Sequence, residues 1–128
     1  MEAKQFKSLV RALREKMKQD CRWAARGLVA VFQNQTYDEQ TSHTTRYLNG
    51  VGFNGLDAAF GSSMAEQAMV WFATPKDKRA CPEPLSLKQG IYAKKMAVKY
   101  ATQVAGFMVS AHPEVAAQIL GEVLSEAA

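Results

Sequence analysis

The segment that decides the fold spans Lys4–Val31 and reads KQFKSLVRALREKMKQDCRWAARGLVAV. Apolar side chains recur in it at intervals of three and four residues, and at about 100° per residue they share one arc about 100° wide. These apolar side chains are Phe6, Leu9, Val10, Leu13, Met17, Ala24, Leu28 and Val31. The spacing predicts an amphipathic α-helix whose apolar side faces the core of the protein.

The opposite side of this predicted helix is basic and spans an arc about 120° wide. It carries Lys4, Lys7, Arg11, Arg14, Lys18, Arg22 and Arg26. If the helix is unbroken from Lys4 to Arg26, these side chains form a stripe about 33 Å long. Gly27 is the expected point of interruption, so one long helix and two shorter helices are both compatible with the sequence.

The middle of the chain predicts a short helix followed by a turn. Thr36 and Glu39 have the spacing of a capping box, which predicts a helix over 37–46. The stretch 49–55 holds two Asn-Gly pairs, and both residue types tolerate positive φ, so we expect a Gly/Asn-rich interhelical loop. Phe53 and Val51 in this loop either pack into the bundle or face a partner.

Further helices follow the loop. Asp57 is placed to cap a helix, and an exposed loop is expected over 74–84. The buried side of that helix is predicted to carry Phe60, Met64, Ala68, Trp71 and Phe72. Ser86 and Gln89 form a second capping box before a long, mostly apolar helix over 87–109. Pro113 suits the first turn of a last helix, capped by His112 or Ser110.

No stretch alternates convincingly between apolar and polar residues, so the prediction is an all-α fold, a compact bundle of about five helices. The chain has 128 residues and a mass of 14.1 kDa, which is typical of one domain spanning 1–128. The longest uncharged run is too short to cross a bilayer, and the N-terminus lacks the apolar core of a signal peptide. We therefore expect a cytoplasmic protein without a membrane partner.

Charge is arranged in blocks along the chain. The formal net charge is +4, but residues 1–30 and 73–103 each carry +5, and the segments that follow them each carry −3. Local charge governs the encounter with a polyanion more than the total does. The alternation therefore indicates two positive surfaces on a protein of modest net charge.

The basic side of the first helix predicts contact with the phosphates of DNA or RNA at low sequence specificity. The alternative interpretation is a solvated helix face that keeps the protein soluble. A second candidate surface lies on the helix over 87–109, where a tyrosine could stack a base while lysines hold the backbone. It consists of Lys88, Tyr92, Lys95 and Lys99. The alternative is that these residues are only the solvent-facing polar side of a mostly buried helix, with the lysine stems covering apolar surface.

Catalytic residues are sparse. His43 lies near acidic residues in the sequence, and Cys21 and Cys81 are possible nucleophiles. Neither a catalytic triad nor a metal site follows from their spacing. The sequence therefore predicts a binding protein without a cofactor or metal rather than an enzyme, and a small enzyme is kept as the second alternative.

Four short stretches carry a resemblance to a group of known proteins. They read TYDEQ over 36–40, NGVGFNGLD over 49–57, LSLKQ over 85–89 and KYATQ over 99–103. This pattern resembles small accessory proteins of phages and plasmids. The resemblance implies action on nucleic acids or on the host machinery that handles them, as anti-CRISPR proteins do. An alternative function is therefore an inhibitor of a host nucleoprotein complex, docked by its arginine face and anchored by Val51 and Phe53.

Overall fold

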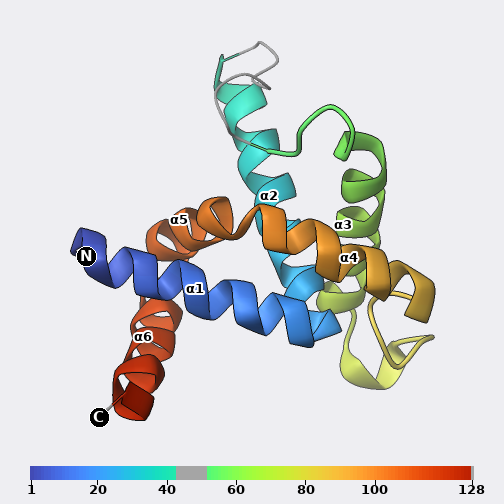
Figure 1. Cartoon of the computed structure of the whole chain (residues 1–128). Helices are drawn as coiled ribbons and strands as arrows, with labels where there is room; N and C mark the ends of the chain where they lie inside the picture. Colours follow the sequence, from blue (N-terminus) through green and yellow to red (C-terminus); the bar gives the residue numbers. More distant parts are fainter. Residues whose placement is uncertain (43–51, 128) are drawn as a thin grey trace.

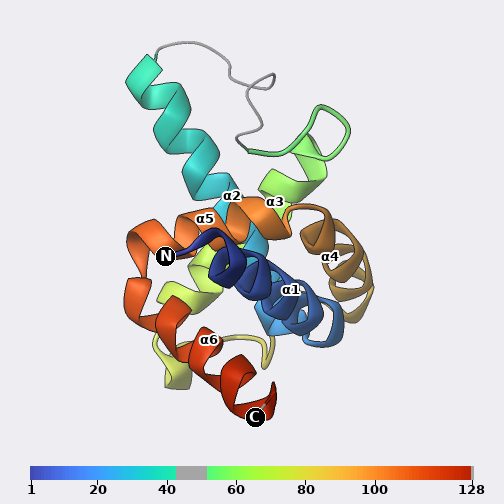
Figure 2. The same ribbon diagram turned by 60° about the vertical axis from the view of Figure 1, so that its left-hand side comes forward.

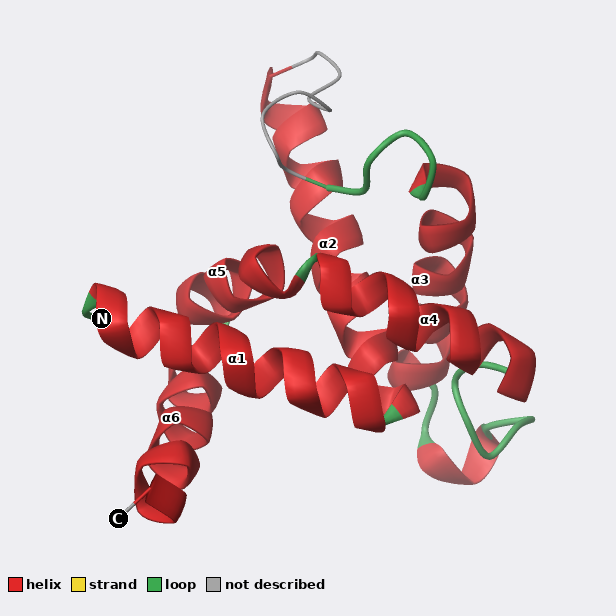
Figure 3. Ribbon diagram, viewed as in Figure 1, coloured by secondary structure: helices red, strands yellow, loops and turns green. Residues whose placement is uncertain are grey.

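The computed structural model describes residues 1–42 and 52–127, with side chains for all of these except 35–42 and 127. Every regular element in the described ranges is helical, which confirms the predicted all-α fold (Figures 1 and 3). The six α-helices there are α1 (Ala3–Gln19), α2 (Cys21–Ser42), α3 (Ala58–Ala73), α4 (Leu87–Lys99), α5 (Ala101–Ala111) and α6 (Pro113–Ala127). A short 3-10 helix, η2 (Lys76–Lys78), lies in the loop before α4.

Helix α2 lies at the centre of the fold and contacts α1, α3, α4 and α5. Figure 1 shows α1 crossing in front of α2, and the turned view in Figure 2 shows the same crossing from the side. Helix α1 also packs against α4, α5 and α6. One side of α1 therefore meets four other helices, and its other side is left to the solvent.

The core contains most of the apolar side predicted for the first segment. Leu9, Leu13 and Met17 of α1 are completely buried, as is Leu28 of α2. Complete burial of a side chain of this size contributes about 1.5–3 kcal/mol. The predicted amphipathic pattern is therefore confirmed, and it fixes which side of α1 faces outward.

The first helix ends at Gln19 rather than at Gly27. Asp20 has an extended backbone (φ −125°, ψ 119°), and its carboxylate accepts a hydrogen bond of 2.8 Å from the backbone N–H of Arg22. Gly27 lies inside α2, where a Cβ would collide with the Sδ atom of Met17. The glycine therefore permits α1 and α2 to approach closely. Of the two alternatives, two shorter helices are present, but they meet at Asp20 and not at Gly27.

The long helix predicted over 87–109 is two helices that meet at Tyr100, whose backbone is not helical (φ −106°, ψ 16°). The Tyr100 hydroxyl donates to Asp57 Oδ2 at 2.6 Å and accepts from the backbone N–H of Asn54 at 3.0 Å. These partners are distant in the sequence, so helical periodicity could not reveal the break. The predicted capping box at Ser86 is confirmed, because Ser86 and Gln89 exchange hydrogen bonds of 2.9 and 3.1 Å.

Helix α2 runs through Thr36 as far as Ser42, so the predicted start of a new helix at Thr36 is wrong. Residues 43–46 of that predicted helix, His43 and the first part of the 49–55 loop lie outside the described residues. Gly52 has φ of 87°, a conformation that favours glycine, in agreement with the predicted turn. Its backbone N–H donates to Gln103 Oε1 at 2.8 Å, and its carbonyl accepts from Gln103 Nε2 at 3.1 Å.

Helix α3 begins after Asp57 as predicted, but the Asp57 side chain does not cap it. The helix is also rotated from the prediction. Gly61 is buried against the ring of Phe53, and Phe60 is 42% exposed, so its predicted burial is wrong. The buried residues of α3 are Gly61, Met64, Ala65 and Ala68. A close contact that only glycine permits therefore sets which side of α3 faces inward.

The last helix begins at Pro113 as predicted, and the His112 carbonyl accepts from the backbone N–H groups of Val115 and Ala116. Ile119 and Leu120 are buried on its inner side. In the part of the chain that the structure describes, no helix is both long and apolar enough to cross a membrane.

Candidate nucleic-acid interface

The outer side of α1 carries five exposed cations, which we call the α1 basic face. It consists of Lys4, Lys7, Arg11, Arg14 and Lys18. Their spacing of three and four residues places them in an arc about 80° wide. From the helical rise, the face is about 21 Å long. Because the opposite side of α1 is buried, the fold itself holds this row toward the solvent.

No side chain of the α1 basic face forms an ion pair or hydrogen bond within the described part of the chain. Glu15, which is near it in the sequence, accepts a hydrogen bond from Gln19 at 2.5 Å. Lys16 lies off the face and pairs with Glu122 of α6 at 3.7 Å. The positive charge of the α1 basic face is therefore not neutralised by carboxylates of the described residues.

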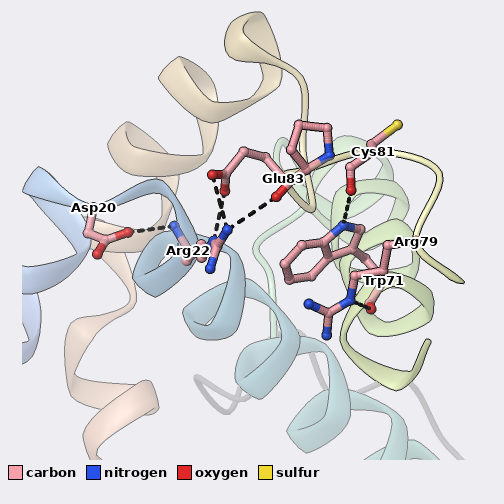
Figure 4. A network of polar contacts seen from close by, with 7 residues as sticks. Asp20, Arg22, Trp71, Arg79, Cys81 and Glu83 are labelled. Carbon is pink, nitrogen blue, oxygen red and sulfur yellow. Dashed lines mark hydrogen bonds and ion pairs between the residues drawn. The ribbon is translucent and has the colours of Figure 1, made fainter. Parts of the chain in front are cut away.

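The last two cations of the predicted stripe do not join this face, because α2 leaves the Asp20 junction in a new direction (Figure 1). Arg22 donates to both carboxylate oxygens of Glu83, at 2.8 and 3.2 Å, and to the Pro82 carbonyl at 3.1 Å (Figure 4). The hydrogen bond to Glu83 raises the pKa of Arg22. The continuous stripe of about 33 Å is therefore wrong.

Arg26 is exposed, and its guanidinium lies over two aromatic rings. The distances from its central carbon to the ring centroids are 5.6 Å for Trp23 and 5.2 Å for Phe72. Such cation–π contacts stabilise a guanidinium without neutralising its charge. A tryptophan three residues before an arginine was the available sequence signal for this contact.

A network of polar contacts holds the loop before α4 against α2 and α3 (Figure 4). The Trp71 indole donates to the Cys81 carbonyl at 2.9 Å, and Arg79 donates from Nε to the Trp71 carbonyl at 3.0 Å. The Arg79 guanidinium also stacks over the Trp71 ring at 3.7 Å from its centroid. Arg79 and Arg22 therefore form hydrogen bonds within the protein, whereas Lys76 and Lys78 are exposed.

The second predicted surface is only partly available. Lys88, Tyr92 and Lys95 are exposed, and the Tyr92 ring packs edge-on against Phe60 with centroids 5.7 Å apart. Lys99, however, forms an ion pair of 2.8 Å with Asp57. This surface therefore keeps two lysines beside a half-exposed tyrosine, and base stacking on Tyr92 stays a prediction.

Asp57 and Tyr100 form the buried end of the Lys99 ion pair. Burial alone would raise the pKa of the Asp57 carboxyl, but hydrogen bonds from Lys99 and Tyr100, with the Lys99 charge, hold it below its usual value. Burial and the hydrogen bond to Asp57 raise the pKa of Tyr100 to about 12. The pair therefore stays a carboxylate and a neutral phenol at neutral pH, an arrangement that ties the 52–57 segment to the α4–α5 junction.

Phe53 lies in the core, with 1% of its surface exposed and its ring packed edge-on against Tyr100 at 5.3 Å. Its predicted role as a residue that contacts a partner is therefore wrong, and the alternative prediction of a side chain packed into the bundle is confirmed. Val51, the other predicted anchor, lies outside the described residues.

The candidate nucleophiles line a groove of about 1150 Å³ between α2, α3, α4 and the loop before α4. Burial raises the pKa of the half-buried Cys21 thiol; Lys94 opposes this, and Glu83 and Asp20 add to it. Cys81 is exposed, and its sulfur points away from the Trp71 ring (Figure 4). In the described ranges, no three His, Cys, Asp or Glu side chains gather as a metal site would require.

Comparisons with protein-family models, with curated proteins and with solved structures find no match to this chain. The resemblance to phage and plasmid proteins therefore stays a prediction.

Proposed function

We propose that this protein binds DNA or RNA without catalysis, through the α1 basic face. The observation that supports this proposal is a row of five exposed cations without carboxylate partners among the described residues. Leu9, Leu13 and Met17 fix the other side of the same helix in the core. The helix that carries the cations is therefore fixed by the fold before a ligand arrives, so its backbone need not be ordered on binding.

The dimensions of the face suit the phosphate backbone. Duplex DNA carries one charge per about 1.7 Å of its axis, so a face about 21 Å long spans about 12 phosphates. Five flexible Lys and Arg side chains have several acceptors within reach over that length. Contacts to phosphate position a protein without reading the bases, so we expect low sequence specificity.

The alternative is an acidic protein partner, such as an acidic surface of a host nucleoprotein complex blocked by an anti-CRISPR-like inhibitor. It would use the same arginines, Arg11 and Arg14. Of its two expected apolar anchors, Phe53 is in the core, and Val51 lies outside the described residues. Nucleic acid needs no such anchor, so the exposed charges favour it over the protein partner.

The test is fluorescence anisotropy with labelled duplex and single-stranded oligonucleotides at about 50 and 200 mM salt. If all five cations contact phosphates, the slope of log affinity against log salt is about −4.5 for duplex and about −3.5 for single strands. Between the two salt concentrations, affinity should then fall about 500-fold for duplex or about 130-fold for a single strand. Absence of binding to both oligonucleotides at the lower salt would contradict the proposal and favour a protein partner.

A matched pair of variants separates the α1 basic face from general positive charge. Arg11→Glu/Arg14→Glu and Lys76→Glu/Lys78→Glu change the net charge equally, and all four side chains are exposed. We expect the first variant to lose binding and the second to keep most of it. Equal losses in both variants, with unchanged circular dichroism, would show that no particular face binds.

A further inference from the structure

An apolar pocket of about 440 Å³ lies between α2 and α5, closed by the end of α3 and the start of α6. Its apolar lining includes Trp23, Phe72, Phe107 and Met108. Small-molecule sites are typically concave, mostly apolar and about 300–1,000 Å³ in volume. The pocket is therefore large enough for a small organic ligand, and it lies on different helix surfaces from the α1 basic face.

The described residues that line the pocket carry charge of one sign only. Arg26 is its formal cation, and His112 and Gln33 supply further polar groups. Among the described residues that line the pocket, none is acidic. Within the described part of the chain, Arg26 forms no ion pair and rests only on the rings of Trp23 and Phe72.

This arrangement leaves the guanidinium ready for an anion. The two rings in contact with the guanidinium also line the pocket. Arg26 therefore lies at the edge of the apolar lining, where it is exposed to solvent. A guanidinium binds a carboxylate through two parallel hydrogen bonds, and an adjoining apolar wall shields that bond from water. The rings around Arg26 therefore place apolar binding surface directly beside a recognition group for an anion.

We propose that this pocket binds a small amphipathic monocarboxylate, with its apolar body between α2 and α5 and its carboxylate on Arg26. Burial of the apolar body supplies the driving force, and the guanidinium selects the anion over a neutral molecule of equal length. Such a site goes beyond nucleic-acid binding, since a phosphodiester backbone offers no apolar body for the pocket. A neutral apolar ligand is the competing occupant.

The experiment compares decanoate with decanol by isothermal titration calorimetry on the full chain. The two probes share one hydrocarbon chain and differ in charge. We expect decanoate to bind about 10- to 100-fold more tightly, from the typical strength of a hydrogen bond to a charged group. Arg26→Gln should reduce decanoate to the affinity of decanol. Equal binding of both probes to the unmodified protein, or binding of neither, would overturn the proposal.

Two further variants locate the ligand. Val29 lines the pocket and is half-buried, so Val29→Trp should fill the space and abolish binding of decanoate. Retained binding in a folded Val29→Trp protein would contradict the proposed location. Arg11→Gln removes the same charge from α1 and should leave decanoate affinity unchanged. If Val29→Trp does not fold, the Arg26→Gln and Arg11→Gln pair still decides whether the charge at the pocket selects the ligand.

Because the two sites use different helices, their tests can fail separately. Arg11→Gln is expected to weaken nucleic-acid binding and to spare decanoate. Arg26→Gln is expected to do the reverse. Loss of decanoate binding in a folded Arg11→Gln protein, or of nucleic-acid binding in a folded Arg26→Gln protein, would contradict the separation of the two sites.

Discussion

Helix α1 and the first turns of α2 carry cations at one continuous sequence spacing, but the fold gives them different surroundings. The five cations of α1 face the solvent without carboxylate partners in the described part of the chain. After the Asp20 junction, Arg22 is bonded to Glu83 and Arg26 rests on aromatic rings. Periodicity therefore predicts the side of a helix on which a residue lies, but a single extended residue decides how far a charged face continues.

Charge reversal on α1 and on the start of α2 should have the largest and most different effects. Arg11→Glu/Arg14→Glu removes two phosphate contacts, so we expect the salt slope for duplex to weaken from about −4.5 to about −2.7. Arg22→Glu/Arg26→Glu changes the net charge equally but should leave most of that slope. It should instead lower the thermal midpoint, because it places a carboxylate beside Glu83 and removes the cation from Trp23.

Anisotropy titrations and thermal denaturation of both variants provide the measurement. The variants have the same net charge, so a difference between them reports the position of the charge. An equal loss of affinity would mean that the position of the charge does not matter. A loss of stability confined to the α1 variant would mean that the α1 cations, and not Arg22 and Arg26, stabilise the fold.

The second prediction concerns the crossing that separates the two groups. Gly27→Ala places a methyl group against Met17, and overpacking of this kind costs about 1–3 kcal/mol. Gly121 of α6 has open space around it, so Gly121→Ala should instead stabilise the protein by about 0.5–1 kcal/mol. Urea denaturation measures both changes. Stabilisation by Gly27→Ala would show that the approach of α1 to α2 does not require glycine.

Local patterns predicted the helical fold well where each helix depends on its own residues. The apolar side of α1, the Ser86 capping box and the start of α6 at Pro113 follow from spacing and residue type alone, and the structure confirms them. All three depend on residues within a few positions of one another. Their physical causes are therefore visible in the sequence.

The errors arose where residues far apart in the sequence meet. The helix breaks at Tyr100, whose hydroxyl bonds to Asp57 and Asn54, and Phe60 is exposed next to Gly61, which packs against Phe53. The same limit applies to the candidate site. The sequence predicted all five cations of the α1 basic face. It could not reveal that Arg22 forms an ion pair with Glu83 or that Lys99 forms an ion pair with Asp57.

The third prediction concerns α4, which carries one lysine in an ion pair and one lysine that is exposed without an ion pair among the described residues. Lys99 pairs with Asp57 at 2.8 Å, whereas Lys95 is exposed and has no ion pair in the described part of the chain. The pKa of Asp57 is lowered in the folded protein, so its carboxylate stabilises the fold above its unfolded pKa of about 3.9. This contribution is lost as the pH falls through the lower pKa of the folded state.

Lys99→Met should therefore raise the pKa of Asp57, because burial then acts with less opposition, and acid unfolding should begin at a higher pH. Lys95→Met removes the same charge from the same helix and should leave the acid transition almost unchanged. Urea denaturation between about pH 2 and 7 spans the transition of a carboxyl whose unfolded pKa is about 3.9. An equal shift in both variants would mean that the summed positive charge of α4, rather than the contact with Lys99, holds the carboxylate ionised. On α4, a lysine in an ion pair would then affect stability no differently from an exposed lysine. A distinct role for cations with a partner would remain only for Arg22 and Arg26 of α2.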